Sequence, residues 1–189
     1  MLPLELNYVR VYVQDQPAPV LFVSAGQINF IMPGIQNPGV VRVRVVVEGL
    51  TGPEITVTLV GAAPALFPMA GGYCITTSAD GKLLTADAPA HANDFVVVYV
   101  TGLGQTSPNP PLAVIPATAA QMTGLTSLQV ALNGTALDPV RIKYAGLTPG
   151  SAGLYQINLV LPDGTGPDPE IWVSAGSLPP QTGLKLPLR

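Results

Sequence analysis

The chain has 189 residues, of which 48% are hydrophobic and 10% are charged, and its formal net charge at pH 7 is −3. Exposed helix faces are normally filled with Lys, Glu and Arg, so this balance favours strands over surface helices. The eight basic residues are scattered singly, which argues against a nucleic-acid partner. No apolar run reaches the length of a membrane span, and the single cysteine excludes an internal disulfide and Cys-based metal clusters.

Several short runs alternate apolar and polar residues with a period of two, which is the pattern of half-buried strands. Residues 8–13 and 41–48 are such runs, and residues 55–59 alternate Ile, Val and Leu with threonine. Residues 95–100 are apolar on both faces, as in a strand that is covered on both sides. The run 128–132 leads into Asn133-Gly134, a pair typical of a two-residue hairpin turn. We therefore predict an all-β fold.

An internal repeat predicts how the strands are organised. Gln27-Ile28-Asn29-Phe30-Ile31-Met32-Pro33 recurs as Gln156-Ile157-Asn158-Leu159-Val160-Leu161-Pro162. Strands roughly every 8–12 residues favour a sandwich, so we predict two tandem immunoglobulin-like β-sandwich modules, residues 1–62 and 63–189. The second copy is preceded by a segment, roughly residues 63–127, that has no counterpart before the first. The first module is therefore expected to be truncated at its N-terminal side.

The truncation carries a structural expectation for the first module. A unit that lacks strands present in its sister exposes an unpaired sheet edge. We expect residues 1–60 to pack this open side on the second module or on another chain, with a symmetric homodimer as one arrangement.

Three motifs give the chain a resemblance to a known family. They are Ala18–Phe30, Tyr99–Gly104 and Tyr144–Asn158, and the resemblance that they carry extends over nearly the whole chain. The chain resembles the uncharacterised C-terminal β-domain found on many large secreted proteins of soil acidobacteria. The resemblance implies export, attachment to a longer polypeptide that continues upstream of Met1, and sandwiches akin to the immunoglobulin-like domains shared by plexins and transcription factors. It implies no activity.

Two candidate sites follow from the residue types. Asp163, Asp168 and Glu170 cluster in a Gly- and Pro-rich turn, and Ca²⁺ favours such oxygen-rich loops, although the spacing is not that of an EF-hand and the prolines restrict convergence. Tyr8 and Tyr12 lie on the outward side of their strand, and Trp172 faces away from its apolar neighbours. Such aromatics can stack on sugar rings or anchor a protein interface, and they can equally cover a second sheet or a neighbouring domain.

The repeated amides admit two interpretations. Gln27 and Asn29, like Gln156 and Asn158, face away from the apolar residues between them, and one interpretation is a ligand site. A structural role is favoured, in which each amide bonds to the backbone of a neighbouring loop, because both copies retain it and buried amides usually satisfy backbone groups.

The remaining candidates for chemistry have simple structural explanations. His91, the single histidine, lies in a predicted loop without a Gly-x-Ser-x-Gly nucleophile motif anywhere in the chain. Gly102-Leu103-Gly104 follows a strand but lacks the third glycine of a nucleotide-binding loop, so a turn explains it. Cys74 is expected to be a small buried hydrophobe.

The sequence thus predicts a non-catalytic, immunoglobulin-like accessory module that needs no cofactor. It would serve adhesion, spacing or attachment in a larger secreted or cell-surface protein. Its partners would be other domains of that protein, or protein or glycan at the cell surface. The alternative is a carbohydrate-binding module of a secreted polysaccharide-active protein. Residues 1–7 carry no signal-peptide pattern, and the extracellular location is expected from the low content of cysteine and lysine and from the resemblance.

Overall fold

The structure is a computed structural model that describes residues 1–34 and 37–189. Within these residues the regular elements are strands, apart from three short 3-10 turns at Ala70–Gly72, Leu125–Ser127 and Pro139–Arg141. The predicted all-β fold is therefore confirmed. The described part of the chain holds no helix that is long and apolar enough to cross a bilayer.

The chain divides into two compact units, each with its own core of buried hydrophobic residues. The first unit comprises Met1–Gly61 and Asn109–Ala117, and the second comprises Ala62–Pro108 and Thr118–Arg189. The segment 109–117 lies in the span that the sequence assigned to the second module, yet it belongs to the first unit. There the backbone N–H of Leu2 donates to the carbonyl of Ala113 over 2.7 Å.

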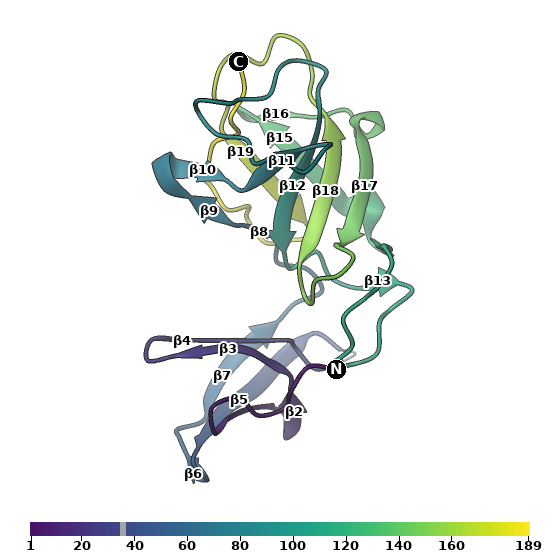
Figure 1. Cartoon of the computed structure of the whole chain (residues 1–189). Coiled ribbons are helices and arrows are strands. Elements are labelled where there is room, and N and C mark those ends of the chain that lie inside the picture. The colour runs from purple at the N-terminus through teal and green to yellow at the C-terminus, as the bar shows by residue number, and fades with distance from the viewer. Residues whose placement is uncertain (35–36) are drawn as a thin grey trace. The chain divides into compact units, whose positions relative to one another are not determined.

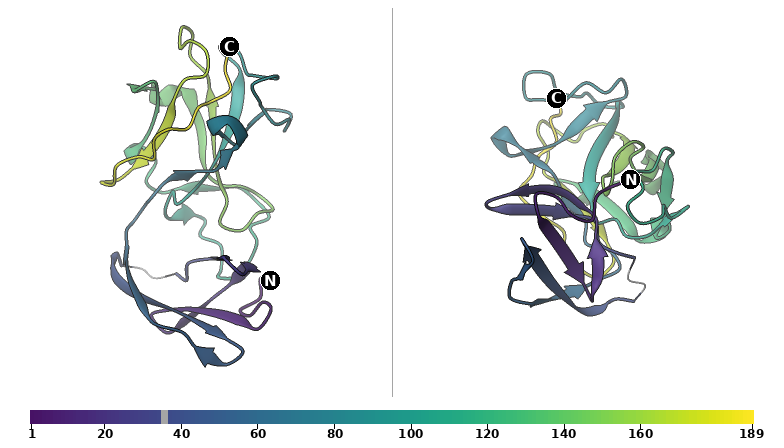
Figure 2. Two further views of the ribbon diagram at one scale, coloured as in Figure 1. Left: turned by 90° about the vertical axis from the view of Figure 1, so that its left-hand side faces the viewer. Right: turned by 60° about the horizontal axis from the view of Figure 1, so that its bottom comes forward.

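The described residues of the first unit form seven strands. They are β1 (Val9–Val13), β2 (Gln16–Ala18), β3 (Val20–Ser24), β4 (Gln27–Phe30), β5 (Gly39–Val47), β6 (Leu50–Thr51) and β7 (Ile55–Leu59). Strands β2, β1, β5 and β6 form one sheet in that order, and β7 pairs with the first half of β5 on the same side as β6. Strands β3 and β4 form a separate hairpin, and the two strands lie side by side in the ribbon views (Figures 1 and 2).

The core of the first unit is small and valine-rich. Alternate residues of β1 and β5 point inward, so Val11 and Val13 meet Val41 and Val43 in one buried cluster. The β1–β2 turn is made by Gln14 and Asp15, which both have positive φ (50° and 65°), the conformation that a two-residue hairpin requires.

Twelve strands make up the second unit. They are β8 (Ala65–Leu66), β9 (Pro68–Met69), β10 (Tyr73–Cys74), β11 (Thr76–Ser78), β12 (Phe95–Thr101), β13 (Thr106–Ser107), β14 (Ala120–Met122), β15 (Leu128–Leu132), β16 (Thr135–Ala136), β17 (Ile142–Leu147), β18 (Tyr155–Val160) and β19 (Ile171–Ala175). A seven-stranded sheet runs in the order β11-β12-β18-β17-β14-β13, with β8 paired to β12 (Figure 1). A three-stranded sheet, β16-β15-β19, covers its inner face, and β9 and β10 form a ribbon.

A continuous core fills the space between the two sheets of the second unit. Val96, Val98 and Val100 of β12 and Ile157 and Leu159 of β18 are all fully buried. They pack in one cluster with alternate residues of β15 and β19 and with three leucines of the C-terminal tail. The predicted hairpin at Asn133-Gly134 joins β15 to β16 with both residues at positive φ (49° and 78°).

The five strands β1–β5 and the five strands β15–β19 share one pattern of pairing. Strand β1 pairs with β2 and β5 as β15 pairs with β16 and β19, and β3 pairs with β4 as β17 pairs with β18. The β3–β4 pair has a register shift between Val20 and Phe22, and the β17–β18 pair has one between Ile142 and Tyr144. The repeat in the sequence therefore corresponds to one recurring strand arrangement.

The two units differ in the layer that contains the hairpin. In the second unit β18 pairs with β12 on the edge away from β17, and β17 pairs with β14 on the edge away from β18. In the first unit, as far as the described residues go, β3 and β4 pair with each other alone. Of the strands in the described residues, this layer of the first unit therefore holds the hairpin alone, and the N–H of Val20 in β3 donates to the carbonyl of Pro3 over 2.8 Å.

Candidate functional site

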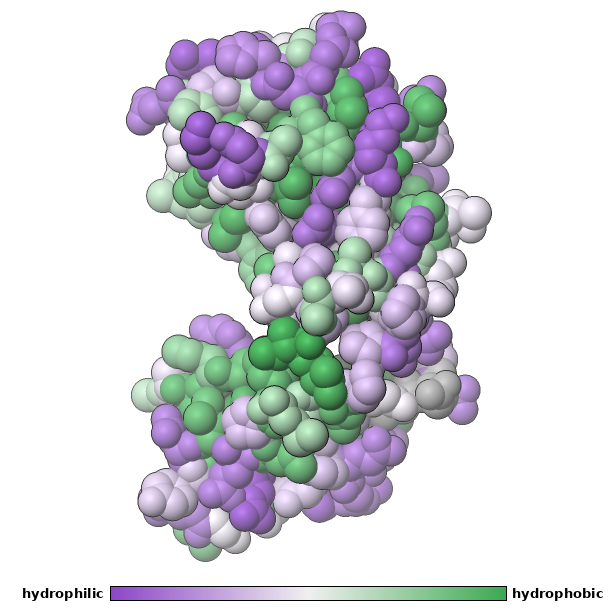
Figure 3. Space-filling view, turned by 45° about the vertical axis from the view of Figure 1, so that its right-hand side comes forward, coloured by the Kyte–Doolittle hydropathy of each residue, from purple (hydrophilic) through white to green (hydrophobic). Residues whose placement is uncertain are grey.

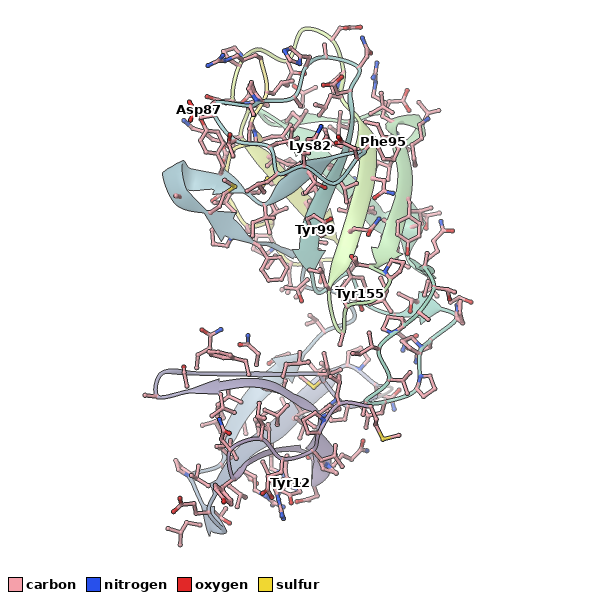
Figure 4. All side chains as sticks on the ribbon, viewed as in Figure 1. Tyr12, Lys82, Asp87, Phe95, Tyr99 and Tyr155 are labelled. Carbon is pink, nitrogen blue, oxygen red and sulfur yellow. The ribbon has the colours of Figure 1, made fainter. Side chains whose placement is uncertain are left out.

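The outer face of the seven-stranded sheet carries a strip of aromatic and amide side chains. Phe95 and Tyr99 of β12, labelled in Figure 4, lie on one side of Gln156 and Asn158 of β18, and Tyr144 of β17 lies on the other. Tyr99 is paired with Gln156, and Tyr144 with Asn158, and residues opposite each other in an antiparallel pair share a face. We call these five residues the aromatic–amide strip.

Tyr144 is fixed along its own strand. Its hydroxyl donates to the backbone carbonyls of Leu147 (2.8 Å) and Ala120 (3.1 Å), which brings the side chain over Gly146. A Cβ atom at Gly146 would lie 2.6 Å from this hydroxyl, so the arrangement requires glycine there. Burial raises the pKa of Tyr144, which keeps the phenol neutral and able to donate.

The two amides of the strip bond to each other. Gln156 Nε2 donates to Asn158 Oδ1 over 2.8 Å, because residues two apart on a strand point to the same face. Among the described residues this is the hydrogen bond that these side chains make with the protein. Gln156 Oε1 thus remains as an acceptor and Asn158 Nδ2 as a donor beside aromatic rings, a combination that suits a polar ligand with a flat apolar face, such as a sugar.

The first unit repeats this amide pair. Gln27 Nε2 donates to Asn29 Oδ1 over 2.7 Å on the outer face of β4. The prediction that the repeated amides bond to the backbone of a neighbouring loop therefore named the wrong hydrogen-bond partner. Both amides lie on a sheet face and not at a loop crossing. The bond runs along the strand because a glutamine side chain is long enough to reach a neighbour two residues away.

The aromatic residues predicted to bind a ligand are divided between the two units. Tyr8 lies in the turn before β1 at φ 62°, and Tyr12 has the guanidinium of Arg44 over its ring, 4.9 Å from the ring centre. Both belong to the first unit, whereas the half-buried Trp172 lies on β19 of the second, opposite Ala131. The face of Tyr12 is therefore already covered, and the predicted outward stripe of tyrosines is interrupted by the turn at Tyr8.

The three carboxylates predicted to bind calcium are held apart by three different partners. Asp163 accepts a hydrogen bond from Asn93 Nδ2, Asp168 accepts one from the Tyr73 hydroxyl, and Glu170 accepts one from the backbone N–H of Gly183. No group of three His, Cys, Asp or Glu side chains suited to a metal is found in residues 1–34 and 37–189. The described structure therefore does not bring the three carboxylates together in one group, because each is bonded to a different segment of the chain.

His91 and the Gly102–Gly104 segment both lie in turns that are held by backbone hydrogen bonds. His91 is an exposed residue of a tight turn, where Asp94 accepts a hydrogen bond from its backbone N–H over 2.8 Å. Gly102 has φ 74° and its carbonyl accepts from the N–H of Ala63, and a Cβ at Gly102 would collide with the Ala63 carbonyl. The Tyr155 hydroxyl, labelled in Figure 4, donates to the Gly104 carbonyl over 2.6 Å.

Cys74 is fully buried in the core of the second unit, as predicted for a small hydrophobe. Its sulfur lies 3.3 Å from the Thr76 hydroxyl, and burial raises the pKa of the thiol. A neutral buried thiol is a poor nucleophile and a poor metal ligand, so this position is structural.

The first unit has a second candidate surface, where its reduced layer leaves apolar residues uncovered. Ile28 and Phe30 point inward from β4 but are only half-buried. Ile55 and Val57 lie on the inner side of β7, because they pair with the buried Val43 and Val41, yet they are 56% and 37% exposed. We call Ile28, Phe30, Ile55 and Val57 the open face.

Exposed apolar residues are concentrated in the first unit as a whole. Besides Ile55 and Val57, the described residues of this unit expose a further set of large hydrophobic side chains, and Figure 3 shows such side chains gathered on the face in view. This set is Met1, Leu4, Tyr8, Leu21, Phe22, Met32, Val40, Val47, Leu50, Leu112, Val114 and Ile115.

The sequence did not identify the aromatic–amide strip as a whole. Residues 95–100 were expected to be covered on both faces, but Phe95 is 37% exposed and Val97 and Tyr99 are half-buried. The signal was present in the aromatic residues at positions 95 and 99, which lie on one face of a strand. Their neighbours Gln156 and Tyr144 come from distant segments, so the strip emerges only from the pairing of the strands.

Comparisons with protein-family models and with curated proteins find no match for this chain.

Proposed function

We propose that the chain is a non-catalytic, immunoglobulin-like accessory module of a larger secreted or cell-surface protein, and that its first unit contacts another polypeptide. The observation that carries the proposal is the open face. Ile28 and Phe30 are half-buried, whereas their counterparts Ile157 and Leu159 in the second unit are fully buried. The same strand arrangement in the first unit therefore leaves these side chains partly open to contact with another polypeptide.

The size of the uncovered side chains supports a contact role. Covering an aliphatic or aromatic side chain removes apolar area from water and is worth about 1.5–3 kcal/mol when the burial is complete. Contiguous apolar patches on soluble proteins commonly mark interaction surfaces. The apolar side chains at the centre of such a patch usually contribute most of the binding energy. The resemblance described above supports the export and the attachment to a longer polypeptide.

Site-specific photo-crosslinking tests this proposal. A photo-reactive phenylalanine analogue replaces Val57 on the open face or, as the control, the exposed Gln129 on β15. In the organism that produces the chain, irradiation is expected to give a covalent polypeptide adduct at position 57 and none at position 129. Equal yields at the two positions, or no adduct at position 57, would contradict the proposal.

A second candidate function is favoured by the aromatic–amide strip. Phe95, Tyr99 and Tyr144 flank an amide acceptor and an amide donor that no described residue occupies, on one face of the sheet, which is a suitable surface for stacking and hydrogen-bonding a sugar. A glycan array with the whole chain tests it. Specific binding that is lost in Tyr99→Ala and retained in Tyr8→Ala would support carbohydrate binding through the strip, and the absence of signal across the array would exclude it for the glycans displayed.

A further inference from the structure

No strand of the described residues pairs with the edge of β4 that points away from β3, which we call the free edge of β4. A counterpart of this edge in the second unit shows what fits there. Strand β18 corresponds to β4 and pairs with β12 on the edge away from β17. We propose that the free edge of β4 binds an extended segment of a partner polypeptide as an additional antiparallel strand, in the position that β12 occupies beside β18. This inference rests on the proposed contact function and names the form of the contact.

The correspondence between β4 and β18 holds residue by residue. Asn29 is paired with Phe22 just as Asn158 is paired with Tyr144, and each pair follows the same register shift. Gln27 and Asn29 share an amide hydrogen bond, as do Gln156 and Asn158. Ile28 therefore corresponds to Ile157, and Phe30 to Leu159.

The burial of these residues shows what β12 adds. Ile157 and Leu159 lie opposite Val98 and Val96 of β12, and all four are fully buried. No strand of the described residues supplies such neighbours to Ile28 and Phe30, which remain half-buried. A strand beside β4 would place two further side chains against them.

The same strand would cover the exposed inner side of β7. In the second unit this layer runs in the order β17, β18, β12. Strand β8 pairs with β12 and also contacts β19 of the other sheet. Strand β19 corresponds to β5, so a strand at the free edge of β4 extends the layer toward β5. The strand beyond β5 is β7, whose Ile55 and Val57 point to this layer and are exposed. One added strand thus accounts for the whole open face.

The register of β12 defines the chemistry of the partner. Positions opposite Ile28 and Phe30 should be β-branched and apolar, as Val98 and Val96 are. Positions opposite Gln27 and Asn29 face outward, where β12 carries Tyr99 and Val97. The partner is therefore an extended segment with β-branched apolar residues at alternate positions and no charge among them, bound through main-chain hydrogen bonds.

A peptide with the β12 sequence is a direct probe. The peptide Asp94–Gly102, with a solubilising lysine tail and a fluorophore, is titrated into the whole chain, and binding is followed by anisotropy. Hydrogen exchange of the backbone amides is then measured by NMR. We expect saturable binding and at least tenfold slower exchange for the amides of β4 that point away from β3. The hydrogen exchange of the β18 amides should not change. A change there would mean that the peptide had displaced β12 from its place beside β18.

Matched variants separate specific pairing from general adhesion. A peptide carrying Val96→Asp and Val98→Asp should not bind, because its inward positions are charged. In the chain, Ile28→Asp should abolish binding, whereas Leu83→Asp, at an exposed apolar residue of the second unit, should leave it unchanged. Circular dichroism of the Ile28→Asp chain checks that it is folded, and Ile28→Ala, which should weaken binding at least threefold, serves if it is not.

Three outcomes would overturn the inference. They are no saturable binding of the peptide, binding without protection of β4, and protection of β4 in the chain alone through self-association as its concentration is raised. If the peptide fails while position 57 still crosslinks to a polypeptide, the contact function stands and the added strand is excluded. If both fail, the contact function falls as well.

Discussion

Strands β4 and β18 carry nearly the same sequence and the same local structure, but they differ in burial. Each contains a Gln-Ile-Asn triplet, pairs with the preceding strand and places two amides on the outer face. Ile157 is fully buried, whereas Ile28 is half-buried. The alternation within a strand determines which side chains point inward, but the neighbouring strands determine whether those side chains are buried.

The comparison extends to the outer faces of the two hairpins. The amide pair on β4 is exposed, whereas the pair on β18 is half-buried between residues of β12 and β17. The same hydrogen bond therefore lies in solvent in one unit and beside aromatic rings in the other. A shared motif can thus serve two different surfaces, an open edge in the first unit and a polar strip in the second.

The largest difference between the units is expected when the two corresponding isoleucines are shortened. Ile157→Ala should lower the free energy of unfolding of the second unit by about 4 kcal/mol, because a fully buried side chain leaves a cavity. Ile28→Ala should cost the first unit about 1 kcal/mol, since its side chain is already half in water. Urea unfolding followed by Trp172, the single tryptophan, reports the second unit, and hydrogen exchange of β1 reports the first. Equal losses would show that the two strands are equally buried in solution.

The next largest effect is expected where glycine lies beneath Tyr144. Gly146→Ala should destabilise the second unit by about 2–3 kcal/mol, because the new methyl group meets the Ala120 carbonyl and the Tyr144 hydroxyl. Ser24 pairs with Gln27 as Gly146 pairs with Gln156, so Ser24→Ala is the matched control and should change stability by less than about 0.5 kcal/mol. Thermal unfolding checks both, and the double variant Gly146→Ala with Tyr144→Phe should recover part of the loss.

The sequence was sufficient for features that depend on local pattern. Alternation predicted β1, β5 and β7, the Asn133-Gly134 pair predicted the β15–β16 turn, and the repeated Gln-Ile-Asn triplet predicted two related strand arrangements. These features are set by residues close together in the chain, where period and turn chemistry act directly.

Features that depend on contacts between distant segments were not accessible in this way. The partners of Asp163, Asp168 and Glu170 come from remote parts of the chain, so proximity in sequence suggested a cluster that the fold does not make. The neighbours of Tyr99 were hidden for the same reason. The short segment 109–117 carries no sequence signal that assigns it to the first unit.

A smaller effect is expected from the repeated amide bond. Asn158→Ala should cost the second unit about 1 kcal/mol, because it removes the acceptor of Gln156 Nε2 at a half-buried position. Asn29→Ala should cost the first unit about 0.3 kcal/mol or less, since solvent replaces the lost bond at an exposed position. Asn158→Asp retains the acceptor oxygen and should lose less than Asn158→Ala in urea unfolding. A loss at Asn29 as large as that at Asn158 would show that the bond and not its surroundings sets the cost.

The smallest effect on stability is expected at Ile55. Its size tests whether Ile55 belongs to an exposed surface or to a closed core. Ile55→Thr retains a β-branched residue, and Thr56 and Thr58 already occupy the same strand, so β7 should form as before. Because 56% of Ile55 is exposed, the free energy of unfolding of the isolated chain should fall by about 0.5 kcal/mol or less. The photo-crosslink from position 57 should nevertheless weaken markedly, since the partner loses an apolar neighbour. A loss of about 2 kcal/mol or more in the free chain would mean that Ile55 belongs to a closed core, and the open face would then have no need of a partner.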